Sequence, residues 1–139
     1  MHGRERAGRG RRILVVEADA SMRQVITQPL EEAGFAVQTV RSASEALAVL
    51  GHQPPRAMLV DLTQPGAEGW AFLERCRQQP RCRRLPIAVV STSVAQDSAG
   101  PGQGQHYGWL PKPFERDQLL TLMDDLTRLR PSRHAEGRA

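Results

Sequence analysis

The chain has 139 residues, of which 40% are hydrophobic and 24% charged, a composition typical of one soluble globular domain. Its longest apolar runs are far shorter than the roughly 20 residues of a membrane-spanning helix, which excludes that class. The basic start, residues 1–12, is not followed by the apolar stretch of a secretory signal, so we expect a cytoplasmic location.

The net charge of +4 lies at the amino-terminus, where residues 1–12 hold five arginines against Glu5. We expect a flexible basic tail over 1–12, a domain over 13–130 and a flexible tail over 131–139. The basic tail either lacks specific contacts or binds nucleic acid, which is the minor alternative. A second basic run, with arginines at 75, 77, 81, 83 and 84, is either a patch for an acidic partner or a solvated helix end.

Apolar runs and helical stripes alternate along the chain. In order, they predict a strand over 13–16, a helix over 22–33 with Pro29 inside it and Gly34 after it, a strand over 35–40, a helix from a capping box at 42–45 to Gly51, a strand over 57–60, a helix from about 70 to Pro80, strands over 86–90 and 109–110, and a helix over 119–129. Such alternation is typical of right-handed βαβ units around a parallel sheet.

The segment 94–108 departs from this pattern. It is rich in glycine and has no helical stripe, although a fourth helix is expected between the last two strands. Glycine is among the weakest helix formers, so we expect a weak or disordered fourth helix, or a loop.

Four predicted strands end on residues that can bind a phosphate or its counter-ion: Glu17, Asp61, Ser91 and Lys112, the only lysine in the chain. In a parallel sheet, ligands bind beyond the carboxyl ends of the strands. Carboxylates can hold Mg²⁺, and an ammonium group can pair with phosphate oxygens. Together these groups suit phosphoryl transfer, with a carboxylate as the acceptor.

Four segments at these strand ends resemble, in the same order, the signatures of response-regulator receiver domains: VVEAD at 15–19, VDLTQPG at 60–66 with Gly69, VST at 90–92 and WLPKPF at 109–114. The resemblance covers about residues 12–130. It implies an α/β, flavodoxin-like fold: a doubly wound five-stranded parallel sheet of order 2-1-3-4-5 with helices on both faces.

The resemblance also implies a role for each matching residue. Asp61 would accept the phosphoryl group, and Lys112 would pair with it through a loop whose bond to Pro113 is cis. Ser91, Thr92 and Trp109 would form the phosphate-binding and switch positions, although Trp109 is equally well explained as a fixed, half-buried aromatic. The implied cofactor is Mg²⁺, held by Glu17, Asp61 and the backbone carbonyl of Thr63.

One position breaks the pattern. In receivers a second acidic residue after the first strand binds Mg²⁺ directly, and here that residue is Ala18. Asp19, one residue later, is a further metal candidate. Loss of one carboxylate beside a divalent ion removes on the order of a few kcal/mol of attraction, so we expect weakened Mg²⁺ binding.

Two functions remain open. The first is a stand-alone response regulator of a bacterial two-component system. It would take a phosphoryl group on Asp61 from a histidine kinase or phosphotransfer protein. It would signal to a target protein by protein contact, without an output domain of its own, and could form a homodimer. It would lose the phosphoryl group by self-dephosphorylation and would not be a classical enzyme. The second is a degenerate receiver that acts as a phosphate-independent interaction module, which Ala18 and the segment 94–108 favour.

Overall fold

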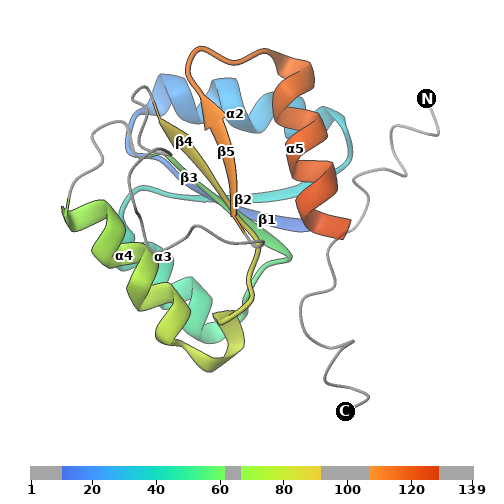
Figure 1. Ribbon diagram of the computed structural model, residues 1–139. Coiled ribbons are helices and arrows are strands. Elements are labelled where there is room, and N and C mark those ends of the chain that lie inside the picture. The colour runs from blue at the N-terminus through green and yellow to red at the C-terminus, as the bar shows by residue number, and fades with distance from the viewer. Residues whose placement is uncertain (1–10, 62–66, 92–106, 129–139) are drawn as a thin grey trace.

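The computed structural model describes residues 11–61, 67–91 and 107–128, and shows one sheet of five parallel strands (Figure 1). The strands are β1 (Arg12–Val16), β2 (Ala36–Val40), β3 (Ala57–Asp61), β4 (Ile87–Ser91) and β5 (Tyr107–Pro111). Their order across the sheet is β2-β1-β3-β4-β5. This is the order that the resemblance implied.

Helices cover both faces of the sheet (Figure 1). The described helices are α2 (Ala20–Glu32), α3 (Ala43–His52), α4 (Ala67–Gln78), the short 3₁₀ helix η1 (Pro80–Cys82) and α5 (Arg116–Arg128). Helices α2 and α5 pack on one face, and α3 and α4 on the other. None of the helices in the described ranges is long and apolar enough to cross a membrane. The expected weak fourth helix at 94–108 falls largely outside the described residues.

The continuous apolar runs become the central strands. Leu14 of β1 faces the core beneath α3 and α4, while Val15, the next residue, faces the core beneath α2 and α5. Because successive side chains of a strand point to opposite faces, a strand covered on both sides needs apolar residues at every position. The edge strand β2 is covered less, and most of its residues are partly or fully exposed.

Helix α2 begins at its cap, Asp19, whose Oδ2 accepts a hydrogen bond of 2.8 Å from the Met22 backbone N–H. Its end is followed by Gly34, with a φ of 99° that favours glycine. Pro29 lies inside the helix without ending it.

The prediction that Gly51 ends the next helix is wrong. Helix α3 continues to His52, and the Gln53 N–H still donates to the carbonyl oxygen of Val49 at 2.9 Å. The stop is set by Pro54, because a residue that precedes proline is driven out of the helical conformation, and Gln53 has an extended φ of −151° and ψ of 97°.

The folded part of the chain begins earlier than the expected boundary after residue 12. Arg12 is the first residue of β1, and the Arg11 guanidinium Nη1 donates to Asp124 Oδ1 at 2.7 Å and to Thr127 Oγ1 at 2.8 Å. The same guanidinium lies 5.9 Å from the centre of the Phe35 ring. These contacts fasten the start of the sheet to α5, so Arg11 and Arg12 belong to the domain.

Gly108 of β5 allows α5 to pack closely on the sheet. A Cβ at this position would lie 2.7 Å from Leu122 Cδ1. We therefore expect Gly108→Ala to lower the free energy of unfolding by about 1 kcal/mol, because the leucine must leave its place. Gly51→Ala is the matched control: its Cβ would meet only Gln79 Oε1 at 3.7 Å, and alanine within a helix should raise stability by about 0.5–1 kcal/mol. Urea unfolding measures both changes, and stabilisation by Gly108→Ala would contradict this packing.

Candidate functional site

An ion pair joins the ends of two strands that are not neighbours. Lys112 follows β5, and its Nζ lies 2.7 Å from Oδ2 of Asp61, the last residue of β3. The two side chains are 14% and 2% exposed, respectively. Strand β4 lies between β3 and β5, so the lysine reaches across the end of β4. The structure thus brings together the acid and the amine that sequence patterns placed at strand ends.

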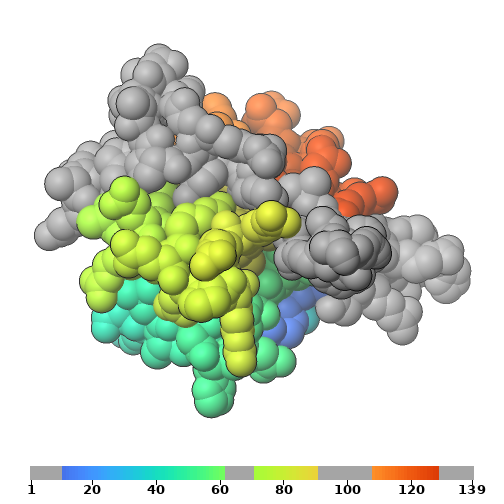
Figure 2. Space-filling model, turned by 60° about the horizontal axis from the view of Figure 1, so that its bottom comes forward, coloured from blue at the N-terminus to red at the C-terminus, as the bar shows by residue number. Residues whose placement is uncertain are grey.

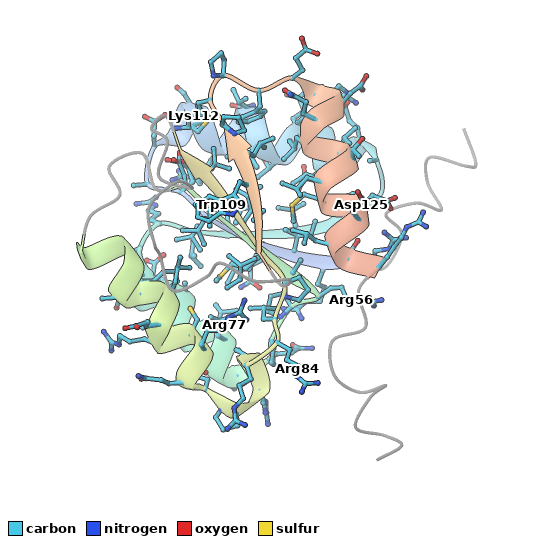
Figure 3. All side chains as sticks on the ribbon, viewed as in Figure 1. Arg56, Arg77, Arg84, Trp109, Lys112 and Asp125 are labelled. Carbon is cyan, nitrogen blue, oxygen red and sulfur yellow. The ribbon has the colours of Figure 1, made fainter. Side chains whose placement is uncertain are left out.

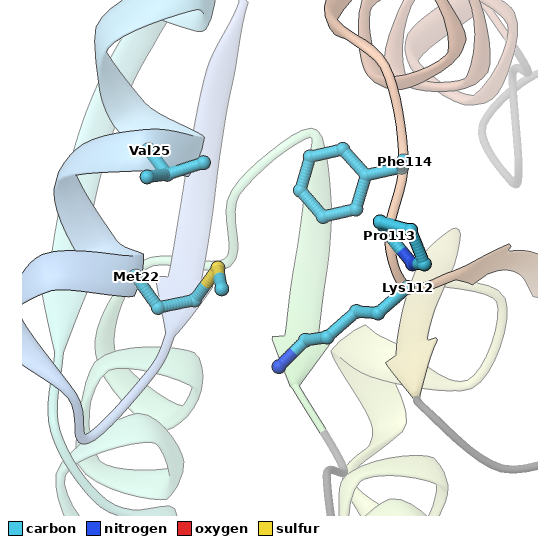
Figure 4. Close-up of a pocket in the computed structure, with 5 residues that line it drawn as sticks. All are labelled: Met22, Val25, Lys112, Pro113 and Phe114. Carbon is cyan, nitrogen blue, oxygen red and sulfur yellow. The ribbon is translucent and has the colours of Figure 1, made fainter.

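The approach of the lysine is set by the loop between β5 and α5. The Lys112–Pro113 peptide bond is cis, as the resemblance implied. The lysine stem lines a cavity of about 340 Å³ together with Pro113 and Phe114 of its own loop and with Met22 and Val25 of α2. Figure 4 shows the amine extending from this loop toward the end of β3. Apolar walls thus surround the stem while the charged end meets Asp61.

Glu17 follows β1 and is buried, with 7% of its surface exposed. Its Oε2 accepts a hydrogen bond of 3.0 Å from the Asp19 backbone N–H. Burial, and next a hydrogen bond shared with the Asp61 carboxyl, raise the pKa of Glu17 from 4.5 to about 7, while the Asp19 N–H and the charge of Lys112 oppose this rise. Two carboxyl groups share a hydrogen bond only when one holds a proton. Glu17 is therefore the group that takes up a proton in this pocket.

The Glu17 carboxyl also offers a ligand atom. Its Oε1 is buried and receives no hydrogen bond from an N–H or hydroxyl donor among the described residues. A buried, ionised oxygen without a donor needs a cation, and Mg²⁺ prefers oxygen ligands. Glu17 and Asp61, on adjacent strands, therefore fit a divalent cation. The described ranges contain no cluster of three or more histidine, cysteine or acidic side chains around such a position.

The two residues after Glu17 add no side-chain ligand to this pair. Ala18 is exposed and has no polar side chain. The Asp19 carboxylate accepts the hydrogen bond from Met22 N–H that caps α2. This contact gives Asp19 a structural role that differs from that of a metal ligand. Thr63, whose carbonyl was the third expected ligand, lies outside the described residues.

Arg23 is a residue that sequence reasoning missed. Its Nη1 donates to the backbone carbonyl oxygens of Glu17 at 3.0 Å and Ala18 at 3.1 Å. The guanidinium therefore holds the loop that carries Glu17. Its position one turn into α2, four residues after the cap Asp19, was the available signal, because such a side chain can reach back to the preceding loop.

The expected switch residues are described only in part. Ser91 is the last residue of β4, and its backbone lies beside Pro111 of β5. Its side chain and all of Thr92 lie outside what the structure describes, so their roles stay predictions. Trp109, labelled in Figure 3, lies in the middle of β5, packs against the core beneath α3 and α4, and borders a groove of about 450 Å³ along α5. This packing is consistent with both roles considered for Trp109, a switch residue and a fixed aromatic.

Comparison with known proteins gives one consistent family. Residues 13–124 match the response regulator receiver domain. The chain is 32% identical over 113 residues to the DNA-binding transcriptional regulator NtrC of Salmonella typhimurium, a match that covers 81% of this chain and 24% of that protein. It is 35% identical over 132 residues to the response regulator MprA of Mycobacterium bovis, covering 92% and 56%. The chain thus spans from about a quarter to about half of these curated relatives.

Solved structures agree with this match. The chemotaxis response regulator CheY4 of Vibrio cholerae shares 26% identity and a TM-score of 0.74, with 84% of this chain and 98% of that chain covered. The receiver domain of the sensor histidine kinase PA1611 from Pseudomonas aeruginosa shares 27% identity and a TM-score of 0.75, with 86% and 99% covered. The latter structure is described with a magnesium ion coordinated in its active site cleft.

The raised pKa of Glu17 predicts how stability depends on pH without metal. Between about 4.5 and 7, the folded state keeps a proton that the unfolded state has lost. The stabilisation is complete below the unfolded value and is lost as the pH rises to about 7. We expect the free energy of unfolding, measured by urea in the presence of a chelator, to fall over this range. Glu17→Gln should remove the fall and the exposed control Glu74→Gln should keep it; an unchanged slope in Glu17→Gln would contradict the assignment.

Proposed function

The chain belongs to the response-regulator receiver domain family, and from this premise we propose that Asp61 accepts a phosphoryl group from the phosphohistidine of a sensor histidine kinase or a phosphotransfer protein. The observation that carries the proposal is the buried contact of 2.7 Å between Lys112 Nζ and Asp61 Oδ2. It supports an ionised carboxylate beside a fixed positive charge, which are the two groups that an acyl phosphate site requires.

In the proposed reaction, a carboxylate oxygen of Asp61 attacks the phosphorus atom. The new oxygen–phosphorus bond forms as the phosphorus–nitrogen bond of the phosphohistidine breaks, and the histidine nitrogen leaves with the electron pair. Lys112 orients the carboxylate before the reaction and pairs with phosphoryl oxygens after it, as a compact point charge. Glu17 and Asp61 would hold Mg²⁺, which when bound neutralises charge on the phosphoryl oxygens.

The phosphorylated chain would signal by contact with a target protein, alone or as a homodimer, and would return to its starting state by self-dephosphorylation. It acts as a phosphoacceptor and not as a classical enzyme. We also propose the cytoplasmic location that the sequence led us to expect. Because the curated relatives extend well beyond the matched region, we assign no DNA-binding output to this chain.

A second candidate function is a phosphate-independent interaction module. Ala18 favours it, because the pocket holds two carboxylates at β1 and β3 while the next acid, Asp19, caps α2. Fewer carboxylates weaken the attraction for a divalent cation. The two candidates therefore differ in one measurable property, the transfer of a phosphoryl group to Asp61.

Phosphoryl transfer can be tested with acetyl phosphate and Mg²⁺ at millimolar concentration. We expect intact-mass spectrometry to show the addition of one phosphoryl group to the wild-type chain and none to Asp61→Asn, because the acceptor oxygen is lost. Asp125→Asn, an exposed change on α5, is the matched control and should still be labelled. Label retained in Asp61→Asn would contradict the proposed acceptor, and a folded wild-type chain without label would favour the interaction module.

The effect of Ala18 can be tested by restoring the acid. Ala18→Asp should raise the affinity for Mg²⁺ by about tenfold or more, because a third carboxylate would lie beside the ion. Ala20→Asp adds the same charge in the first turn of α2 and should change the affinity much less. Isothermal titration calorimetry measures both. Equal affinities of the two variants would show that position 18 does not face the ion.

A further inference from the structure

Five arginines gather at the end of the sheet opposite the phosphoacceptor, and we call them the basic edge: Arg12, Arg56, Arg81, Arg83 and Arg84. Arg12 opens β1, Arg56 directly precedes β3, and the others lie in or just after η1, before β4. Parallel strands begin at the same edge of a sheet, so the topology brings these residues together. Figure 3 shows Arg56 and Arg84 at the opposite end of the molecule from Lys112.

The two segments that carry four of these arginines have charge of one sign. Neither residues 51–60 nor residues 75–91 contain an aspartate or a glutamate. Arg81, Arg83 and Arg84 are exposed, and Arg12 and Arg56 are half-buried. Figure 2 brings this end of the molecule forward and shows the yellow segment around η1 projecting beside the green and teal residues of the α3–β3 connection.

Hydrogen bonds to neutral groups orient two of the guanidinium groups, those of Arg12 and Arg81. Arg81 Nη1 donates to the His52 carbonyl oxygen at 3.3 Å, and Arg12 Nη1 donates to the Pro54 carbonyl oxygen at 3.1 Å. Such acceptors fix a guanidinium without neutralising its charge. Among the residues that the structure describes, Arg12, Arg81 and Arg83 form no ion pair.

The turn that carries Arg83 and Arg84 is itself held in place. Arg77 Nη1 donates to the carbonyl oxygens of Cys82 at 2.9 Å and Leu85 at 2.6 Å, on either side of the two exposed arginines. Arg77 thus acts as an internal brace for this turn. A charged surface with a fixed backbone loses less conformational entropy on binding than a mobile one.

The chemistry of the basic edge fits phosphate groups. The planar fork of a guanidinium matches a phosphate in bidentate geometry. Protein interfaces, by contrast, usually have an apolar centre. Val25 is the exposed large hydrophobic residue within the described ranges, and it lies on α2, outside the basic edge.

We propose that the basic edge binds the phosphodiester backbone of a nucleic acid, without reading its base sequence. Contacts to phosphates position a protein on nucleic acid and carry no sequence information directly. The basic edge and Asp61 lie at opposite ends of the parallel strands, so this binding leaves the phosphoacceptor accessible. The inference does not depend on phosphoryl transfer and stands if Asp61 is never phosphorylated.

The test is fluorescence anisotropy of the full chain with a labelled oligonucleotide of about 20 nucleotides and mixed sequence, as a single strand and as a duplex, between about 50 and 200 mM salt. We expect binding that weakens steeply with salt. The triple variant Arg81→Gln, Arg83→Gln, Arg84→Gln should lose about tenfold or more in affinity at the lowest salt. The plot of log affinity against log salt concentration should also become less steep, its slope changing by about 2 to 3 because each lost phosphate contact changes it by about 1.

A control double variant, Arg41→Gln, Arg116→Gln, removes charge from exposed sites at the Asp61 end of the sheet and should stay close to the wild type. Should the triple variant fail to fold, as judged by circular dichroism, Arg83→Glu tests the same surface with one exposed substitution. The proposal is overturned by a wild-type chain that does not bind, or by a loss in the control variant as large as the loss in the triple variant. Equally tight binding of poly-glutamate, or loss of binding only on substitution of Arg4, Arg6 and Arg9, would also overturn it.

Discussion

The ion pair between Asp61 and Lys112 is the constraint on which the rest of the site depends. The Asp61 side chain is only 2% exposed. Leaving this buried carboxylate without a partner would lower the free energy of unfolding by roughly several kcal/mol. Its partner comes from the far side of β4, so the pair forms only when the sheet has its observed order and α5 holds the β5–α5 loop in place. The fold and the pairing of Asp61 are therefore one requirement, and the proposed phosphoacceptor role depends on the same geometry.

A second acid, Glu17, lies beside this ion pair. Glu17 lies close enough to Asp61 to share a hydrogen bond, and its buried carboxyl holds a pKa of about 7. Near neutral pH it therefore changes easily between its protonated and its ionised form. An acid at position 18 would add a third negative charge to this pocket. Ala18 adds no charge there, and Arg23 holds its loop through the Glu17 and Ala18 carbonyls.

The strands, and the meeting of Asp61 and Lys112 at one edge of the sheet, could be predicted from apolar runs and the residues that follow them, whereas the strand order came from the resemblance to receiver domains. Strands buried on two faces need continuous apolar runs, and the residues directly after them meet at one edge. The end of α3 could not be assigned from Gly51 alone, because the conformation imposed by Pro54 decides it. Arg23 escaped prediction because it bonds backbone carbonyls, so its position one turn after the cap Asp19 was its only sequence signal. The roles of Ser91 and Thr63 stay predictions.

The most direct test of the account uses the fact that Lys112 is the only lysine. Isotopic labelling of lysine gives a single set of side-chain resonances in nuclear magnetic resonance spectra. The account predicts that these resonances shift on Asp61→Asn, and that in the wild type they shift again when Mg²⁺ and the phosphoryl mimic beryllofluoride are added. Resonances that match those of an exposed lysine and respond to neither change would contradict a phosphate site built on this pair.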